Sequence, residues 1–495
     1  MNLMSNHSKK DTTIVSNDEA TAQNSKPLVN SLTDDVLGND DAVGIAEKIR
    51  RGDLDARSVT LAAIERAQSV NPKLNAIAAE DFDAAVSASH KTFEGFFQGV
   101  PTFIKDTDEV QGLPLYMGSR SLPGEVSTRF SDTAKKVLTT GLNCLGTTTT
   151  PEFGLTGSTE SMRFGATRNP WNPAYSTGGS SGGSSAMVAA GVVPIAHAND
   201  GAGSIRIPAS CCGLVGLKAS RGRIKDKETP SYFPANIFHE GVVTRTVRDT
   251  WAFFSSIERQ NPAEGLPPIG NISETCRTNL RIAVLTEDCR GEPCADDLVR
   301  ASRGIATQFE ALGHRVEAIS NPFYRQFDAD FWLLWAHCAF VLRYGAAKEV
   351  SQKFDPSKLE PWARYLVNHQ WKNLHKLPTA FWRLKRFISD YERIFDNYDI
   401  LLTPTLGTTT PQIGVFGPEV DGETHWRRIQ DFLPFTKYQN ISGGPAISLP
   451  CATDNEGLPI GIQLATRLGD DRLLLELSLQ LERAFAWNSL RYSSS

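Results

Sequence analysis

After a polar N-terminal segment, stretches with apolar residues at helical spacing alternate with short, continuous apolar runs. Apolar residues at helical spacing predict helices over 42–49 and 296–312. Short apolar runs bounded by turn residues predict strands over 99–105, 280–285 and 314–318. Strands that alternate with helices in this way are typical of proteins built around a sheet with helices packed on it. The pattern therefore predicts a mainly α/β protein.

Two segments differ from the rest of the chain. Residues 1–40 are polar and lack the apolar core of a signal peptide, so we expect a mobile N-terminal tail there. Residues 329–396 have helical spacing and are rich in tryptophan and phenylalanine, which predicts a helical cover with an aromatic core. The last residues, 489–495, are expected to form a short C-terminal tail.

Composition and charge exclude several classes of protein. The chain is 40% hydrophobic and 22% charged, so it can bury a sizeable core. A net charge of −5 gives no basic excess toward nucleic acid or anionic lipid. No apolar stretch reaches the ~20 residues that span a bilayer. The eight cysteines are sparse and form no pair of CxxC units, which favours thiols in a reducing cytoplasm over a disulfide framework or a zinc site.

A segment dense in glycine and serine, GATRNPWNPAYSTGGSSGGSS over 165–185, leads into a small-residue stretch over 186–193 that we expect to be helical. A loop of this kind on a rigid helix is a frequent place for function. The chain has no P-loop, and the glycines near Arg206 do not complete a dinucleotide fingerprint. Gly178–Gly182 matches the nucleophile elbow G-x-S-x-G, but two prolines over 169–177 oppose the central strand that an elbow requires.

Several motifs taken together resemble the amidase signature family over residues from about 40 to 488. They are PTFIKD around Lys105, GGSSGGSS around Ser180, GSIRIPAS around Ser204, CGLVGLK ending at Lys218 and GPAISLP over 444–450. The resemblance implies one large α/β domain over 41–488, with a central mixed β-sheet covered by helices on both faces. It implies neither a metal nor an organic cofactor.

The family's catalytic lysine, bridging serine and nucleophile fall on Lys105, Ser180 and Ser204. This Ser-Ser-Lys triad implies an acyl-serine intermediate. A serine hydroxyl is a weak nucleophile until a base takes its proton. A lysine is a base only when neutral, and burial can lower a lysine pKa by up to ~3–5 units. His197 lies seven residues before Ser204 and is interpreted as a core or loop histidine.

The glycine-rich loop before the nucleophile implies an oxyanion hole made by backbone N–H groups. Its members are Gly201, Ala202, Gly203 and Ser204. Glycine there permits positive φ and a close approach to substrate. Ala202 stands where the family usually has a second glycine, and neither residue type removes a backbone donor.

Other residues of the motifs are expected to support the triad. Asp200 and Arg206 are expected to brace the loop through charge-assisted hydrogen bonds, and Ser181 supports the bridging serine. The family places a cis peptide before its bridging serine, which corresponds to Gly179–Ser180. Asn199 stands where threonine or serine is common.

The resemblance implies an amide-bond hydrolase acting on small aryl, alkyl or oligomeric amides, with side activity on esters and carbamates. The loop sequence is closest to the acylamidase and oligoamide-hydrolase branch, which includes enzymes for cyclic amide dimers. An ammonia-releasing subunit of a tRNA-dependent amidotransferase is the alternative, and the intact triad disfavours a silent binding scaffold. The aromatic cover has a functional interpretation as a lid over an apolar acyl pocket. The oligomeric state stays open, with a homodimer among the alternatives.

Overall fold

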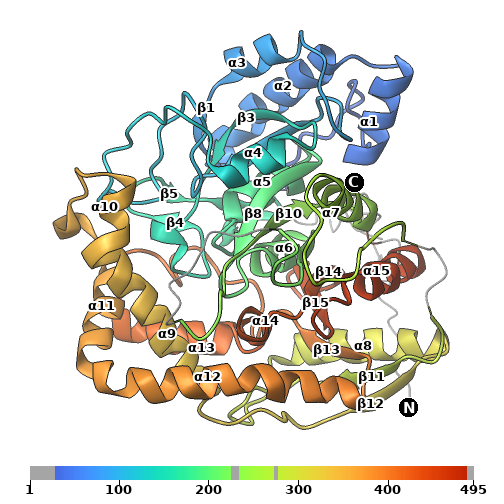
Figure 1. Cartoon of the computed structure of the whole chain (residues 1–495). Helices are drawn as coiled ribbons and strands as arrows, with labels where there is room; N and C mark the ends of the chain where they lie inside the picture. The colour runs from blue at the N-terminus through green and yellow to red at the C-terminus, as the bar shows by residue number, and fades with distance from the viewer. Residues whose placement is uncertain (1–27, 225–232, 273–276, 486, 488–495) are drawn as a thin grey trace, which may run out of the picture.

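The computed structural model describes residues 28–224, 233–272, 277–485 and 487 (Figure 1). The strands of its large sheet are β8 (Ile195–Asp200), β9 (Val215–Lys218), β10 (His239–Thr244), β11 (Arg281–Val284), β12 (Arg315–Ala318), β13 (Ile400–Pro404), β14 (Ala446–Thr453) and β15 (Pro459–Ala465). A smaller sheet contains β1 (Ile77–Glu80), β2 (Pro101–Lys105) and β3 (Asn143–Thr148). Two short ribbons pair β4 (Glu160–Ser161) with β5 (Gly165–Ala166), and β6 (Arg168–Asn169) with β7 (Asn172–Ser176).

The large sheet has eight strands in the order β12-β11-β13-β15-β14-β9-β10-β8. The strand β11 runs parallel to β12 and to β13. The pairs from β13 through to β8 are antiparallel. The sheet is therefore mixed, as the resemblance implies.

The longer helices are α1 (Ala42–Arg51), α2 (Ala56–Leu74), α7 (Val247–Gln260), α8 (Asp296–Ala311), α9 (Phe327–Val341), α11 (Pro361–Asn373), α12 (Leu377–Glu392), α13 (Gly422–Phe432) and α15 (Asp471–Phe485). The shorter ones are α3 (Phe82–Ala88), α4 (Asp132–Leu138), α5 (Gly182–Ala189), α6 (Arg206–Cys212), α10 (Ala347–Val350) and α14 (Thr436–Ser442). Single turns are η1 (Glu152–Gly154), η2 (Leu342–Ala346), η3 (Pro356–Lys358), η4 (Leu374–Lys376) and η5 (Arg393–Asp396).

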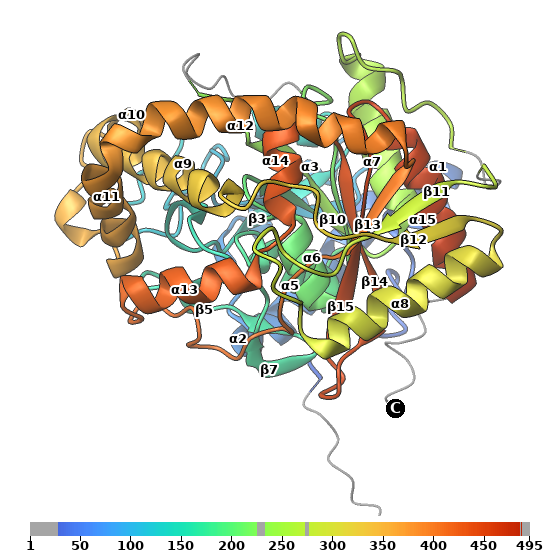
Figure 2. The same ribbon diagram turned by 90° about the horizontal axis from the view of Figure 1, so that it is seen from below.

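Helices cover the large sheet on both faces, which confirms the predicted fold class (Figures 1 and 2). The helix α6 packs against β9, β14 and β15, and α15 packs against α7 and β14. The strands β2 and β8 of the two sheets contact each other directly, and the helix α5 contacts both. The residues of β2 and β8 that carry polar side chains are thereby brought to one place.

The helix expected over 186–193 starts earlier than the sequence predicts, because α5 spans Gly182–Ala189. Its first turn is made of glycines that have no room for a side chain. A Cβ on Gly182 would lie 2.2 Å from the Thr159 hydroxyl, and one on Gly183 would lie 2.6 Å from the Thr149 backbone nitrogen. The glycines therefore serve close packing, and the glycine-rich composition hides the start of a helix. The strand β7 before this loop belongs to a two-stranded ribbon and not to the large sheet.

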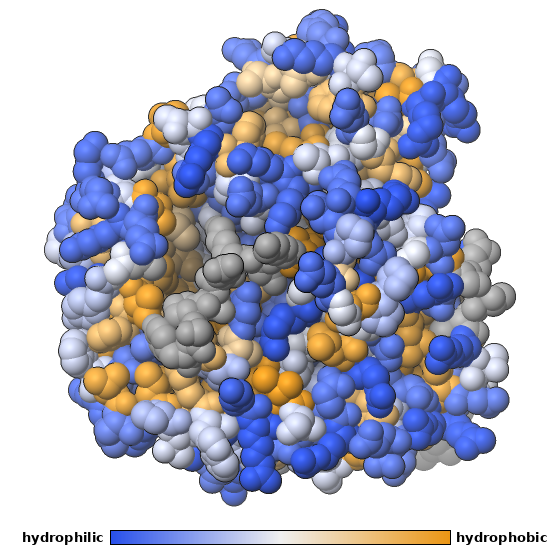
Figure 3. Space-filling model, viewed as in Figure 1, coloured by the Kyte–Doolittle hydropathy of each residue, from blue (hydrophilic) through white to orange (hydrophobic). Residues whose placement is uncertain are grey.

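The predicted aromatic cover over 329–396 is helical. The helices α9, α11 and α12 pack on one another, and they reach α13 and α14 (Figure 2). The helix α9, with the sequence FDADFWLLWAHCAFV, is apolar on nearly all sides and is largely buried, as expected for a helix inside a layer of helices. Apolar side chains also reach the surface over α12 and its neighbours (Figure 3), and Trp371 and Trp382 are more than half exposed.

The end of the predicted N-terminal tail packs against the domain. The Ser31 N–H and hydroxyl both donate to the Ala190 carbonyl, each at 2.8 Å, and Asp35 accepts from Arg66. The described part of the predicted tail therefore contacts the domain that the sequence analysis places over 41–488. Residues 1–27 and the C-terminal tail over 489–495 lie outside the described residues.

In the described part of the chain, every helix is too short or too polar to cross a bilayer.

Candidate active site

Lys105 ends β2 and is fully buried. Its Nζ lies 2.7 Å from Ser180 Oγ and 2.6 Å from Asn199 Oδ1. Burial lowers the pKa of Lys105 to about 7, although the carboxylates of Glu240, Asp108 and Asp200 act in the opposite direction. Near pH 7, a large fraction of this amine is therefore neutral and able to accept a proton.

Ser180 lies in the glycine turn just before α5. The Gly179–Ser180 peptide is cis, as the resemblance implies. A Cβ on Gly179 would lie 2.7 Å from the Ser158 backbone carbon, so the turn has no space for a side chain there. Thr150 Oγ1 donates to the Ser180 carbonyl at 2.9 Å. The Ser180 hydroxyl is thus held against the end of the Lys105 side chain.

Ser204 follows β8 in the turn that leads into α6. Its carbonyl accepts from the Ser181 N–H at 3.3 Å. The Ser181 hydroxyl in turn donates to the Asn199 carbonyl at 3.2 Å and accepts from the Asn199 N–H at 3.3 Å. The structure therefore brings Lys105 and Ser180 into direct contact, and it joins the Ser204 turn to them through the backbone of Ser181.

The turn that carries Ser204 is held by a buried ion pair. Arg206 donates to Asp200 at 2.9 and 3.0 Å, and both side chains are fully buried. Burial alone would raise the pKa of Asp200, but the guanidinium holds that pKa well below its usual range. The Gly203 N–H donates to Asp200 at 2.6 Å. These contacts are the bracing contacts expected from the sequence, and they leave Gly203 without a donor for other groups.

A narrow cavity of about 10 Å³ lies beside Ser204. Its walls are mostly apolar and come from η1, the Ser204 turn, α9 and α13; the lining residues are Gly154, Leu155, Thr156, Gly157, Ala202, Ser204, Ile207, Trp332, Trp335, Ile429 and Leu433. Trp335 and Trp362 both donate their indole N–H to the Leu155 carbonyl, each at 3.0 Å. The aromatic cover therefore builds part of the wall and fixes the η1 segment.

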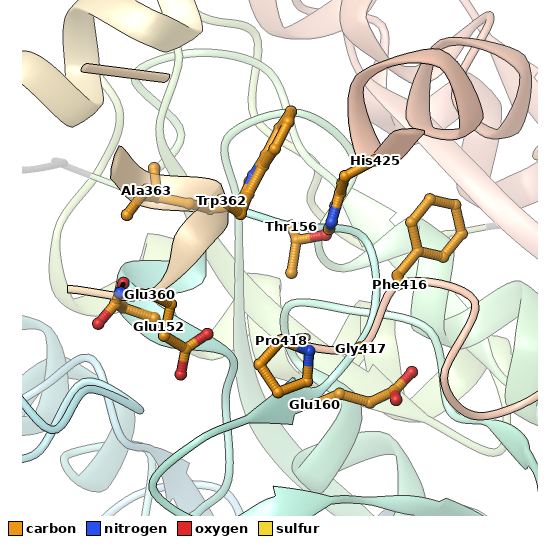
Figure 4. A pocket seen from close by; sticks show the side chains of 11 residues that line it. Glu152, Thr156, Glu160, Glu360, Trp362, Ala363, Phe416, Gly417, Pro418 and His425 are labelled. Carbon is orange, nitrogen blue, oxygen red and sulfur yellow. Dashed lines mark hydrogen bonds between the residues drawn. The ribbon is translucent and has the colours of Figure 1, made fainter. Parts of the chain in front are cut away.

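A second small cavity shares Leu155 and Thr156 with the first (Figure 4). Burial raises the pKa of Glu152 to about 7, and burial together with Glu152 raises the pKa of Glu360 to about 8. The Glu360 N–H donates to Glu152 at 2.8 Å. The Glu152 carboxyl group and the Glu360 backbone thus connect η1 to the start of α11, and sequence reasoning did not single these residues out.

A group of buried polar residues lies behind Lys105; His197 was interpreted as a core or loop histidine, whereas Asp108 and Glu240 were not singled out. The His197 Nδ1 accepts from the Lys105 backbone N–H at 3.2 Å, and its Nε2 lies 3.0 Å from Glu240 Oε2. Ligand atoms of Asp108, His197 and Glu240 lie within 4.8 Å of one another. Both ring nitrogens of His197 already have protein partners. The available signal was the period of two in β8, which places His197 and Asn199 on one face of the strand.

Two other residues in the motifs, Cys211 and Lys218, have surroundings that favour a structural role over a catalytic one. Burial raises the pKa of Cys211 to about 12, so its thiol stays protonated at neutral pH. Lys218 is fully buried on β9 and donates to the Ala219 carbonyl at 2.9 Å. Both agree with the structural interpretation of these residues.

The chain is similar to known amidases over most of its length. The profile of the amidase family matches residues 58–475. The chain is 44% identical to the protein named as amidase AmiC in Mycobacterium tuberculosis (strain ATCC 25618 / H37Rv), over 93% of this chain and 97% of the relative. It is 34% identical to the 6-aminohexanoate-cyclic-dimer hydrolase of Paenarthrobacter ureafaciens, over 91% and 96% of the two chains.

Solved structures show the same fold. A structure of 6-aminohexanoate cyclic dimer hydrolase superposes with a TM-score of 0.81 at 32% identity, over 90% of this chain and 97% of the other. A bacterial aryl acylamidase superposes with a TM-score of 0.80 at 25% identity, over 92% and 98%. The chain therefore belongs to the amidase signature family and is an amide-hydrolysing enzyme.

Proposed function

We propose that this chain hydrolyses small aryl, alkyl or oligomeric amides through a Ser-Ser-Lys triad, in which Ser204 is the nucleophile. The observation that carries the proposal is the contact between a buried amine and a serine. Lys105 Nζ lies 2.7 Å from Ser180 Oγ, and burial brings the Lys105 pKa to about 7. A general base with a pKa near the working pH combines availability with sufficient strength.

The first step forms the acyl-enzyme. Neutral Lys105 accepts the proton of Ser180, and Ser180 accepts the proton of Ser204. The Ser204 oxygen then attacks the amide carbon, and the carbonyl oxygen becomes an oxyanion. Asn199 supports this direction of transfer, because its carbonyl oxygen accepts an N–H of the lysine at 2.6 Å while its amide donates to Thr107 at 2.8 Å. The lone pair of the neutral amine is thereby left for Ser180.

Backbone N–H groups of the Ser204 turn stabilise the oxyanion in this mechanism. The sequence resemblance assigned four such residues to the hole. Because the Gly203 N–H donates to Asp200, we assign the oxyanion contact to the N–H groups of Gly201, Ala202 and Ser204. Loss of one such donor typically costs ~2.7–4 kcal/mol of transition-state stabilisation.

The same relay then runs in reverse. The protonated Lys105 returns its proton through Ser180 to the leaving nitrogen, so that an amine departs and Ser204 keeps the acyl group. Water attacks the acyl carbon and gives its proton to the relay, and collapse of the second intermediate releases the acid and restores Ser204. Esters and carbamates fit the same steps, because an alcohol leaves more easily than an amine.

The apolar walls of the cavity beside Ser204 support an apolar acyl group in the substrate. These walls include Trp332, Trp335 and Ile429, and the open volume of the cavity is about 10 Å³. We infer that the cover acts as a lid, because a space of this size holds about one water molecule, and an acyl group therefore enters only if α9 moves. Relatives named as acylamidase and as cyclic-dimer hydrolase support simple and oligomeric amides as substrates.

The test is a panel of anilides, aliphatic amides, ω-amino oligoamides, carbamates and esters, with intact-protein mass spectrometry to trap the acyl adduct. We expect turnover of at least one amide class and an adduct on the peptide containing Ser204. Ser204→Ala should abolish both while thermal unfolding stays close to that of the wild type.

Normal turnover by Ser204→Ala would contradict the nucleophile assignment. An adduct on another residue would do the same. Activity on glutamine alone, with ammonia transferred to a co-purifying partner, would favour the amidotransferase subunit instead.

A further inference from the structure

Two neighbouring strands place His197 and Glu240 behind the catalytic lysine. In the antiparallel pair β8–β10, Glu240 lies opposite Asn199, and Val242 lies opposite His197. The His197 and Glu240 side chains therefore project from one face of the sheet, where diagonal neighbours come within reach of each other. The His197 side chain is fully buried, and that of Glu240 is 8% exposed.

The hydrogen bonds indicate which ring nitrogen of His197 carries the hydrogen. The His197 Nδ1 accepts the Lys105 backbone N–H at 3.2 Å, so this nitrogen carries no hydrogen. The hydrogen of the ring is then on Nε2, which donates to Glu240 Oε2 at 3.0 Å. A neutral imidazole that donates to a carboxylate leaves the negative charge of Glu240 without compensation from the histidine.

Two other carboxylates near Lys105, Asp200 and Asp108, also favour its protonated form. Asp200 pairs with Arg206, so its charge is matched by a guanidinium. Asp108, in the turn after β2, accepts from Ser131 at 2.9 Å and from Thr107 at 3.2 Å. Ser180 and Asn199, which contact Lys105 Nζ directly, are uncharged. Glu240 is thus a buried carboxylate whose charge acts on a cation at position 105 together with that of Asp108.

We propose that Glu240, held in place by neutral His197, is the counter-charge that stabilises the protonated form of Lys105 and so sets its strength as a base. This proposal rests on the relay proposed above and deepens it, because Lys105 gains a proton each time a serine or a water is activated. Removal of an amine from water weakens it as a base, and a buried carboxylate nearby restores part of that strength. Among the carboxylates that raise the Lys105 pKa, Glu240 has the largest influence. Glu240 is therefore a positioning residue that acts through Lys105.

The test measures the pH dependence of Ser204 labelling by a fluorophosphonate probe. In this reaction the Ser204 oxygen bonds to phosphorus as the phosphorus–fluorine bond breaks, fluoride leaves, and the serine proton passes through Ser180 to Lys105. The labelling rate is read by mass spectrometry from pH 5 to 10, so it does not depend on the natural amide substrate.

We expect Glu240→Gln to move the acid limb of this profile to lower pH by about one unit, because the lysine loses its proton more readily. The plateau at high pH should fall about tenfold, because a weaker base activates the serine less well. His197→Gln keeps a donor for Glu240 but cannot gain a proton, so its acid limb should stay within about 0.3 unit of the wild type.

The matched control is Glu258→Gln in α7. This carboxylate is also largely buried and pairs with Arg223, but it is outside the charges that act on Lys105. Its acid limb should coincide with that of the wild type. If Glu240→Gln does not fold, Glu240→Asp replaces it, because aspartate keeps the charge and withdraws it by one methylene. The limb should then move to lower pH by a few tenths of a unit.

An unmoved acid limb in folded Glu240→Gln, or in Glu240→Asp if that variant is used, overturns the inference and leaves the proposed function intact. Loss of the acid limb in His197→Gln also overturns it, because the histidine is then the titrating group. A wild type that labels at Ser204 with the expected shifts but cleaves no amide overturns the proposed substrate class alone. A wild type that is not labelled at Ser204 overturns both proposals.

Discussion

The two walls around Ser204 are built from different interactions. On the sheet side, the Ser204 turn is held by the buried Asp200–Arg206 pair and by hydrogen bonds from Ser181. On the cover side, Trp332 and Trp335 supply apolar surface, and the Trp335 indole N–H donates to the Leu155 carbonyl at the end of η1. The sheet-side wall is therefore held by an ion pair and directional hydrogen bonds, whereas the cover-side wall is formed mainly by the packing of apolar side chains.

This difference separates two tasks. Proton transfer and oxyanion binding require donors at defined distances, which buried hydrogen bonds and ion pairs provide. Selection of an acyl group requires a surface that fits it, which apolar side chains on helices provide. We therefore expect changes on the sheet side to reduce the rate or the stability, and changes on the cover side to alter the choice of substrate.

The largest effect should come from Lys105. Lys105→Ala removes the proton acceptor of the proposed relay, so kcat for amides should fall by about 10⁴-fold, as steady-state kinetics would show. Lys105→Arg keeps a cation that does not give up its proton, and it should be equally inactive. Appreciable turnover by the arginine variant would mean that another group is the base.

The next largest effect should come from the Asp200–Arg206 ion pair that holds the Ser204 turn. Arg206→Met leaves Asp200 buried without its partner, which should lower the free energy of unfolding by about 3–5 kcal/mol in urea titrations. The double variant Asp200→Asn with Arg206→Met should regain part of this loss. A single variant as stable as the wild type would show that the ion pair does not hold the sheet-side wall.

A Ser180 variant distinguishes proton delivery to the leaving nitrogen from the attack of Ser204 on the carbonyl carbon. Ser180→Ala interrupts the path to the leaving nitrogen, so amide hydrolysis should fall about tenfold more than ester hydrolysis, because an alcohol departs with less help. The comparison uses an anilide and a phenyl ester with the same acyl group. Equal losses for both would argue that Ser180 has no part in protonating the leaving group.

The smallest effect is expected on the cover side. Trp335→Phe removes one of the two donors to the Leu155 carbonyl and enlarges the cavity. KM for substrates with larger acyl groups should fall about fivefold relative to KM for smaller ones. The kcat values should change little. Trp382→Phe, in an exposed part of the same cover, is the control and should leave both constants unchanged. A large loss of kcat in Trp335→Phe would end the division of tasks between the walls.

The sequence predicts the layered fold well because local patterns carry it. The strands at 281–284 and 315–318 and the helix between them have clear periods and turn residues at their ends. The strands β8 and β10 were not predicted. Their sequences, IAHAND and HEGVVT, contain polar side chains at the buried positions that build the site, so the apolar alternation that marks a strand is interrupted there.

The candidate site was predicted only as far as its motifs extend. Lys105, Ser180 and Ser204 stand in distinctive local sequences, and the contact of Lys105 with Ser180 agrees with the assignment. Glu240 and Glu360 have no local motif. Each is defined by contacts with residues far away in the sequence, Glu240 with His197 and Glu360 with Glu152. Pairings of this kind arise from the tertiary fold, and a single sequence does not display them.

Through Ser31, the polar segment before α1 contacts a helix of the candidate site. The two hydrogen bonds of Ser31 end on the carbonyl of Ala190, the residue that closes the helix whose opposite end follows Ser180. Anyone who shortens this protein for crystallisation would do well to cut before residue 28. A cut at residue 40 would remove the hydrogen bonds of Ser31 to the C-terminal end of α5. The N-terminal end of this helix follows the turn that contains Ser180.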